Sequence, residues 1–316
     1  QNRPDFTRSI LNISLGYLWK GSKTQRFAVY PFEVNSVYVN PSPAFQAKLD
    51  SLNDPRLLYS YDTHLIPSGR FTWVFNNQEI RKNGNFFFVR GNLEFAGLIL
   101  TGLAKPLNLK TDAEGNYKVF DIKYSQYIKP DIDMSYHQLL DPNNSLVYRI
   151  AAGIGIPVFT SRALPFEKSF FAGGANSLRA WSARTLGPGA YKKLVNIEQS
   201  GDIKIEANFE YRSFLLHLLE SAQLEGAAFV DAGNIWTRND DPARPGSQFE
   251  FQHMIKEMGL GAGVGLRFNF SFFILRLDAA VKLRDPSLDL AKRWVYPNQK
   301  FVIGDITPNL AIGYPF

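Results

Sequence analysis

The feature that most constrains this chain is a set of long segments in which apolar and polar residues alternate. In 203–212, IKIEANFEYR, the odd positions hold Ile, Ile, Ala, Phe and Tyr, and the even positions hold Lys, Glu, Asn, Glu and Arg. Because successive side chains of a strand point to opposite faces, this segment is predicted to be a strand with one apolar and one charged face. The same alternation recurs in 87–99, 258–269 and 273–284.

The length of these segments decides between two all-β architectures. A soluble sandwich or barrel keeps its apolar faces inward and uses strands of about five or six residues. Several alternating segments here run for ten residues or more, and a strand that crosses a membrane needs roughly 9–11 residues. The sequence therefore predicts an all-β fold, a transmembrane antiparallel β-barrel whose charged faces point into the lumen.

Composition agrees with a membrane barrel and excludes several other classes. The 316 residues include 26 Phe, 14 Tyr and 5 Trp, which suit a lipid-facing surface with aromatic girdles. The chain has no cysteine, so disulfides and cysteine metal sites are excluded, and no apolar run is long enough for a transmembrane helix. The net charge of +6 is spread without a basic block, so nucleic acid is not an expected partner.

The connections between the predicted strands alternate between short and long. We predict about eleven strands, near 6–19, 26–38, 69–79, 85–102, 119–137, 145–160, 203–218, 224–236, 257–270, 272–284 and 300–314. Short connections, such as 21–26 and 83–84, alternate with long ones, the longest being 161–202. Short periplasmic turns and long outer loops are typical of barrels in the outer membrane of Gram-negative bacteria. We therefore expect extracellular long loops and a periplasmic C-terminus.

The longest loop contains the motif on which a family resemblance rests. Residues 170–189 read FFAGGANSLRAWSARTLGPG. This pattern of Phe, paired glycines, Ser, Arg and an aromatic residue resembles the outer-membrane assembly superfamily that contains BamA and TamA, also called the bacterial surface antigen family. Further matches follow in the family's order: GDIKIEANFEYR, FVDAGNIW, GLGAGVGLRFN, LRLDAAVKLRDP and the terminal GYPF. The N-terminal segments DFTRSILNISLGYLWK and RFTWVFNNQ also look like the TamA-like lipoprotein branch, TamL.

The resemblance implies a barrel of sixteen strands with the long loop between its eleventh and twelfth strands. Five predicted strands follow the loop here and six precede it. We therefore expect residues 1–316 to be the C-terminal portion of an outer-membrane barrel, with a lumen-docking loop at about 161–202. The first strands and the periplasmic POTRA domains of the family are expected to be missing. Eleven strands are not expected to close by themselves, because single-chain bacterial barrels have even strand numbers.

In the family the long loop folds back into the barrel lumen, and its arginine meets acidic groups on the inner wall. The resemblance assigns this role to Arg179, with Asp231 and Glu210 as the matching acids. A guanidinium offers a rigid fork of donors that suits bidentate carboxylate binding. Ala180 stands where the family usually has glycine, and it would be strained if that position required positive φ. The loop motif consists of Gly173, Gly174, Ser177, Arg179 and Trp181.

Arg179 has two possible roles at this stage. It can be a scaffold residue that only holds the loop, or it can act directly in substrate handling.

The last residues, PNLAIGYPF, resemble the C-terminal assembly signal of outer-membrane proteins. The residues expected to share one face of this last strand are Leu310, Ile312, Tyr314 and Phe316.

The resemblance implies a protein that inserts or assembles other outer-membrane proteins without a cofactor. The seam between its first and last strands would open and template a client strand by β-augmentation. Expected partners are outer-membrane lipids, unfolded outer-membrane client proteins, and inner-membrane or periplasmic assembly partners reached through the missing N-terminal domains. A two-partner secretion translocator and a passive outer-membrane channel stay open as alternatives.

We predict no enzymatic site and no metal site. The four histidines, His64, His137, His217 and His253, lack metal-ligand spacing, and neither HExxH nor GxSxG occurs. Ser135 and His137 lie on one face of a predicted strand, a coincidence that is expected among so many strands. The run GAGVG (261–265) lies within a strand, so its small residues are expected to relieve crowding in the lumen rather than to bind phosphate.

Overall fold

The computed structural model describes residues 5–52, 54–78, 80, 84–112, 115–192, 199–219, 222–270 and 272–316. Most of these residues form long strands. They are β1 Phe6–Lys20, β2 Gln25–Pro41, β3 His64–Asn76, β4 Phe86–Ala96, β7 Tyr127–Asp141, β8 Asn144–Ile154, β10 Ile203–Leu219, β11 Ala222–Trp236, β12 Gly259–Phe270, β13 Ile274–Arg284 and β14 Thr307–Ile312. Three two-residue strands are β5 Lys118–Val119, β6 Ile122–Lys123 and β9 Ile156–Pro157.

Short helices occupy the connections between strands. They are α1 Pro43–Leu52, α2 Pro55–Ser60, α3 Leu98–Gly102, α4 Met254–Glu257 and α5 Val295–Asn298, with 3₁₀ turns η1 Phe166–Lys168, η2 Leu290–Lys292 and η3 Ile303–Asp305. The Asp54 carboxylate caps α2, because it accepts hydrogen bonds from the N–H groups of Arg56 and Leu57 at 3.0 Å each. None of the helices in the described part of the chain is long and apolar enough to cross a membrane.

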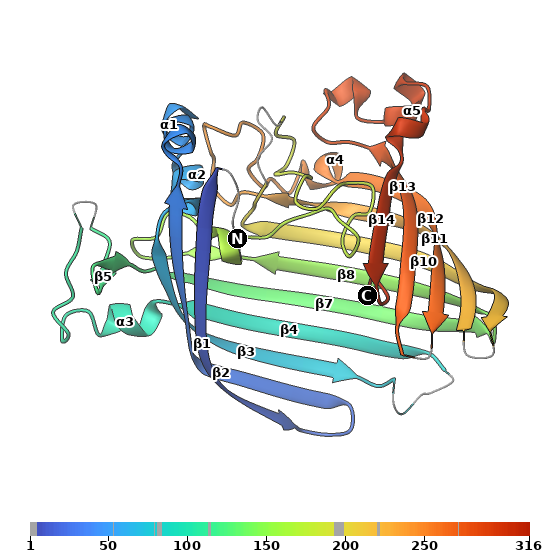
Figure 1. The fold of residues 1–316 in the computed structure, drawn as a ribbon, viewed down its shortest axis with the longest axis horizontal. Helices are drawn as coiled ribbons and strands as arrows, with labels where there is room; N and C mark the ends of the chain where they lie inside the picture. Colours follow the sequence, from blue (N-terminus) through green and yellow to red (C-terminus); the bar gives the residue numbers. More distant parts are fainter. Residues whose placement is uncertain are drawn as a thin grey trace. The chain divides into compact units, whose positions relative to one another are not determined.

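The described strands form a sheet in the order β1-β2-β3-β4-β7-β8-β10-β11-β12-β13-β14, in which β9 pairs with β7. Strands β10 to β14 run side by side with antiparallel registers (Figure 1). For example, β10 pairs with β11 from Ile203↔Trp236 to Leu219↔Ala222. The order is a path with β1 at one end and β14 at the other. The prediction of an all-β, antiparallel fold is confirmed, and an open sheet fits a partial barrel.

Contacts divide the chain into two compact units. Unit 1 consists of Gln1–Val74, Gly91–Asp131 and Ile154–Ser169. Unit 2 consists of Phe75–Arg90, Ile132–Gly153 and Phe170–Phe316. Unit 1 therefore contains β1, β2 and the helices α1 to α3, and unit 2 contains β10 to β14 together with most of the long loop.

In unit 2 the charged faces of the strands are the buried faces. Along β10, Glu206, Asn208 and Glu210 are at most 4% exposed, whereas the alternate residues Phe209 and Tyr211 are 39% and 37% exposed. A soluble sandwich has the reverse arrangement. The alternation read from the sequence therefore turns apolar side chains outward, as a membrane barrel requires.

In unit 1 aromatic rings line the β1–β2 hairpin near its turn. Trp19 lies between Tyr17 and Phe27, with ring centroids 5.4 and 5.3 Å apart. At the other end of β1, Phe6 packs against Phe45 of α1, with ring centroids 5.9 Å apart. Helix α1 lies in the long connection between β2 and β3.

Two predicted strands begin or end elsewhere. The predicted strand 85–102 stops at Ala96, because Gly97 adopts a φ of 71° and the chain continues as α3. The predicted strand 119–137 begins only at Tyr127, because the residues before it form the β5–β6 hairpin. In the first place a turn ends the strand early, and in the second place a hairpin makes the strand begin late, although the apolar pattern of the sequence continues through both.

The last strand is much shorter than the predicted 300–314, because η3 precedes β14 and Gly313 follows it with a φ of 85°. The alternation of faces is broken at this glycine. The expectation that one face carries Leu310, Ile312, Tyr314 and Phe316 is therefore wrong: the first two are 68% and 75% exposed, and the last two turn toward the buried arginines of unit 2.

Short and long connections alternate where they can be followed. Residues 21–24 join β1 to β2 and residues 142–143 join β7 to β8, whereas helices fill the longer connections. Three predicted short turns, 83–84, 220–223 and 270–271, include residues outside the described part of the chain.

The outward face of β12 offers a direct test of the membrane assignment. Val264 lies near the middle of this strand and is 62% exposed. We expect Val264→Lys to lower the free energy of unfolding in lipid vesicles by about 2–4 kcal/mol. This is the cost of a lysine on the lipid face at the bilayer midplane. Urea titration of vesicle-folded protein measures this, with Val264→Leu as the control. Equal stability of the two variants would contradict a lipid-facing β12.

Candidate functional site

The second part of the long loop packs as an apolar cluster against the strands of unit 2. The cluster joins Ala172, Leu178, Ala180, Trp181 and Leu186 of the loop to Phe229, Ile235 and Ala280 of the wall, all at most 3% exposed. Gly173 and Gly174 have φ values of 96° and 99°, which glycine adopts without strain. The Gly174 N–H donates to the carbonyl of Trp181 at 2.8 Å, so the loop closes on itself at this point.

Arg179 is the centre of the docked loop and is fully buried. Its Nε and Nη2 donate to the two carboxylate oxygens of Asp231 at 2.9 and 2.8 Å, and its backbone N–H donates to the same carboxylate at 3.0 Å. Its Nη1 donates to Glu210. The guanidinium carbon lies 3.4 Å from the ring centroid of Phe229. The structure thus brings together Arg179, Asp231 and Glu210, the arginine and acids that the resemblance pairs.

Ser177 and Asn208 add a second set of contacts between the loop and the wall. The Ser177 hydroxyl donates to Glu206 and accepts from the Gly173 N–H at 3.1 Å. The Asn208 amide donates to the Ser177 carbonyl at 3.0 Å and to Asp231 at 2.9 Å. The loop serine and the loop arginine are therefore held by neighbouring side chains of β10.

Further buried charges extend this network along β12 and β13. Arg267 contacts Glu210 at 3.2 Å and donates to Asp278 at 2.6 Å. Arg276 contacts Asp278 at 3.2 Å and donates to the loop carbonyl of Ala175 at 2.7 Å. Alternation put these side chains on the polar face, but they were not among the predicted site residues. Pairing them required the strand register, which the sequence pattern does not supply.

Arg149 of β8 completes the network on the other side of β10. It donates to both carboxylate oxygens of Asp133 at 2.9 and 2.8 Å, to Asn208 at 3.0 Å and to Glu206 at 3.3 Å. Arginine forks of this kind fix the geometry of carboxylates as well as neutralising them. The acids that receive the loop are therefore themselves held in place.

The glycines of β12 form the surface on which the loop rests. A Cβ added to Gly261 would lie 2.5 Å from the Cβ of Ala180, and one added to Gly259 would lie 2.9 Å from the Trp181 ring. Ala180 is 1% exposed and is not among the described residues with positive φ. Alanine is therefore unstrained here, and the crowding predicted around 261–265 is observed at this contact.

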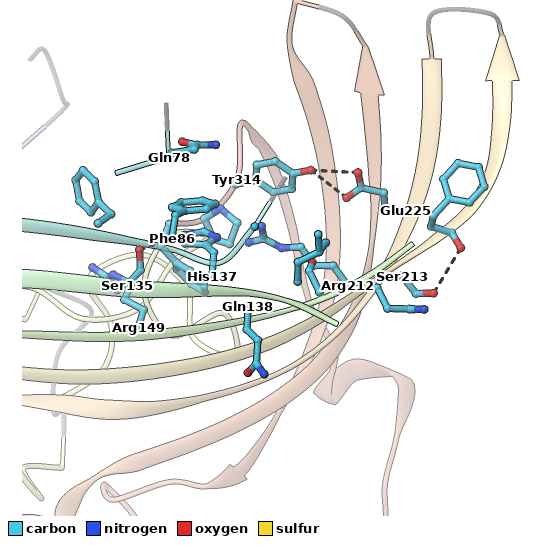
Figure 2. Close-up of a pocket in the computed structure, with 18 of the residues that line it drawn as sticks. Gln78, Phe86, Ser135, His137, Gln138, Arg149, Arg212, Ser213, Glu225 and Tyr314 are labelled. Carbon is cyan, nitrogen blue, oxygen red and sulfur yellow. Dashed lines mark hydrogen bonds between the residues drawn. The ribbon is translucent and has the colours of Figure 1, made fainter. Parts of the chain in front are cut away.

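A cavity of about 910 Å³ lies beside the loop in unit 2 (Figure 2). Within it the Phe86 ring stacks on His137, with ring centroids 4.1 Å apart. The His137 Nε2 lies 3.2 Å from the Ser135 hydroxyl. A hydrolytic triad also needs a group that orients the histidine, and no carboxylate of the described residues hydrogen-bonds to His137.

The C-terminal tail lies against the same buried arginines. The Tyr314 hydroxyl donates to Glu225 at 3.0 Å (Figure 2), and its ring centroid lies 4.1 Å from the Arg212 guanidinium carbon. The Phe316 ring centroid lies 5.7 Å from the Arg179 guanidinium carbon. The residues after Gly313 therefore belong to the site, not to an outward strand face.

In unit 1 a separate polar cluster holds the start of the long loop. Glu167 contacts His64 at 3.2 Å and Arg8 at 3.4 Å, and Lys168 contacts Glu94 at 2.6 Å. Burial acts to raise the pKa of the Glu167 carboxyl, but His64 and Arg8 hold it below its usual value. The sequence pattern alone does not pair these residues, because their partners lie on strands distant in sequence.

Comparisons with known proteins identify a family and a fold for this chain. A family model described as "Omp85 superfamily domain" matches residues 8–305. BamA from Haemophilus ducreyi lacking POTRA domains 1-3 is similar with a TM-score of 0.58 and 13% identity, over 97% of this chain and 54% of that one. CdiB from Escherichia coli is similar with a TM-score of 0.53 and 13% identity, over 89% and 42%.

At this identity, the likeness to the two solved structures concerns the fold alone. The chain spans about half the length of each of these two structures. No curated protein gives a significant match.

The ion pairs of Arg179 predict how the loop responds to substitution. Arg179→Ala removes the bidentate partner of Asp231 and one of the arginines around Glu210, and breaking a buried pair costs about 3–5 kcal/mol. We therefore expect the loop 161–202 to become sensitive to protease in the full-length protein, measured by limited proteolysis. Lys192→Ala, an exposed position in the same loop, is the control and should leave cleavage unchanged. Equal protection of Arg179→Ala and the wild type would argue against the docked loop.

The contact between β12 and the loop predicts a rescue. Gly261→Ala places a Cβ against Ala180 and should expose the loop to protease, and adding Ala180→Gly should restore protection. Gly263→Ala is the matched control, because its Cβ would meet the Ala279 carbonyl oxygen at 2.3 Å and should not be rescued by Ala180→Gly. Failure of the rescue at Gly261 would show that the loop does not rest on this glycine.

Proposed function

This chain belongs to the Omp85 superfamily, as its motifs predicted, and on this premise we propose that it is the barrel of a factor that assembles other outer-membrane proteins. The β-barrel fold of the family implies the outer membrane of a Gram-negative bacterium. In this proposal the long loops are extracellular and the C-terminus is periplasmic, since short turns alternate with long loops.

The observation that carries the proposal is the end of the sheet at β14. This strand has six residues, and it pairs with β13 only from Leu275↔Ile312 to Ala280↔Thr307. Pro308 lacks a backbone donor. A strand end with unpaired backbone groups is a template for another strand. In the full-length barrel β14 would meet the first strand over at most these six residues, so a client strand can add to this edge by β-augmentation when that seam opens.

The short last strand is also expected to thin the lipid bilayer around it. Six extended residues span roughly 20 Å at about 3.4 Å per residue, which is less than the hydrocarbon thickness of about 30 Å. A bilayer that meets a short hydrophobic segment thins locally. In this proposal such thinning lowers the barrier for a client strand that enters the membrane beside β14.

The same proposal implies further strands and domains outside residues 1–316. We propose that residues 1–316 are the C-terminal portion of a barrel with an expected sixteen strands, preceded by POTRA domains; the partial coverage of the two solved structures supports this. Its partners would then be outer-membrane lipids, unfolded client proteins, and periplasmic or inner-membrane proteins that bind the preceding domains. Of the family's branches, we propose the TamA-like lipoprotein branch on the N-terminal motifs.

A two-partner secretion translocator is the second candidate. The docked loop is compatible with it, because a loop held by buried ion pairs can also act as a plug that an exported partner displaces. The same loop disfavours a passive channel, which needs a free lumen.

Depletion of the full-length protein in its host, followed by quantitative proteomics of the outer membrane, separates these functions. We expect a broad fall in many barrel proteins, because an assembly factor serves many clients. Loss of one secreted partner alone would instead identify a translocator. An unchanged proteome with altered uptake of small solutes would identify a channel and would overturn the proposal.

A further inference from the structure

The last strand is held by less backbone pairing than the strands before it. β14 follows η3, pairs with β13 over six residues, and ends where Gly313 turns the chain inward. One of these six residues, Pro308, cannot donate a backbone hydrogen bond. Contacts other than the sheet ladder therefore have a large share in fixing where β14 lies.

Two side chains on the inner face of β14 supply such contacts. The Thr307 hydroxyl donates to the backbone carbonyl of Ala180 at 3.1 Å. The Asn309 amide donates to the backbone carbonyl of Arg179 at 2.9 Å. Both acceptors lie in the long loop, one on Arg179 and one on the residue after it, so the last strand is bonded to the arginine whose side chain holds the loop to the wall.

Arg179 thus joins three parts of unit 2. Its guanidinium binds Asp231 and Glu210, its carbonyl accepts from Asn309, and the Phe316 ring lies 5.7 Å from its guanidinium carbon. If the loop leaves the wall, the β14 side chains lose their acceptors in the same event. Side chains on the outer face of β14 have no such connection, since Leu310 is 68% exposed.

We propose that Thr307 and Asn309 are positioning residues that clamp β14 to the docked loop, so that undocking of the loop frees the end strand. This rests on the proposed function, because the freed strand is the one proposed to template clients. Coupling of this kind is reciprocal: if the loop stabilises the strand, the strand stabilises the loop to the same extent.

Amide hydrogen exchange of the full-length protein in lipid nanodiscs tests the clamp. In Thr307→Val/Asn309→Leu we expect exchange of residues 307–312 to be roughly thirtyfold faster, as the loss of two ordinary hydrogen bonds predicts. By reciprocity, exchange of residues 170–192 should accelerate as well. Leu310→Ala, on the outer face of the same strand, is the control and should leave exchange of the loop unchanged.

Arg179→Ala provides the second arm, because it undocks the loop without touching β14. Faster exchange of residues 307–312 in this variant supports the clamp. Exchange of 307–312 at the wild-type rate, or a Thr307→Val/Asn309→Leu variant in which the loop is unaffected, overturns it. If Arg179→Ala fails to fold, the clamp variant alone decides, because it keeps every buried ion pair.

The outcome is distinguishable from failure of the proposed function. Exchange measures the link between loop and strand without any client protein. Coupled exchange in a protein whose depletion leaves the outer-membrane proteome unchanged would uphold the clamp and reject the assembly role. Uncoupled exchange with a broad loss of barrel proteins would do the reverse.

Discussion

The pairing of one buried arginine with two wall carboxylates is the interaction on which the site depends. Arg179 and both of its acids, Asp231 and Glu210, are 0% exposed, so each charge is held only by its partners and their hydrogen bonds. Desolvating such charges costs several kcal/mol for each ion, and this cost is offset only when the geometry is good. The loop is therefore held in one position. The ion pairs stabilise the loop where Arg179 makes its bidentate contact with Asp231, and the loop loses these ion pairs in any other position.

The strands around this pair are arranged to make that position possible. Arg267 of β12 and Arg149 of β8 hold the acids of β10 from two sides. Gly261 leaves room for Ala180, and β14 donates to the motif from the remaining side. The loop is thus received by a polar network and a groove of glycines, whereas the apolar side chains of the same strands turn outward. These strands therefore bury charged side chains and expose apolar ones, which is the opposite of the arrangement in a soluble protein.

Much of this could be predicted from the sequence, because a strand encodes its two faces locally. Alternation correctly placed Glu206 and Glu210 on one face of β10, and the motif resemblance matched Arg179 with the acids that it contacts. Cross-strand partners could not be predicted, because the Arg276 and Thr307 contacts with the loop span about 100 residues or more of chain and depend on register. The inward turn at Gly313 was missed, since glycine permits positive φ without requiring it.

A double-mutant cycle between Arg179 and Asp231 tests the central claim most directly. The free energy of loop opening would be measured by exchange of the Gly189 amide, which donates to the Ile235 carbonyl of β11, in the wild type, Arg179→Ala, Asp231→Ala and the double variant. If the buried pair holds the loop, the two effects are non-additive, with an interaction energy of about 0.5–3 kcal/mol. Additive effects would contradict this, because the loop would then be held by contacts in which the arginine and its carboxylate act independently.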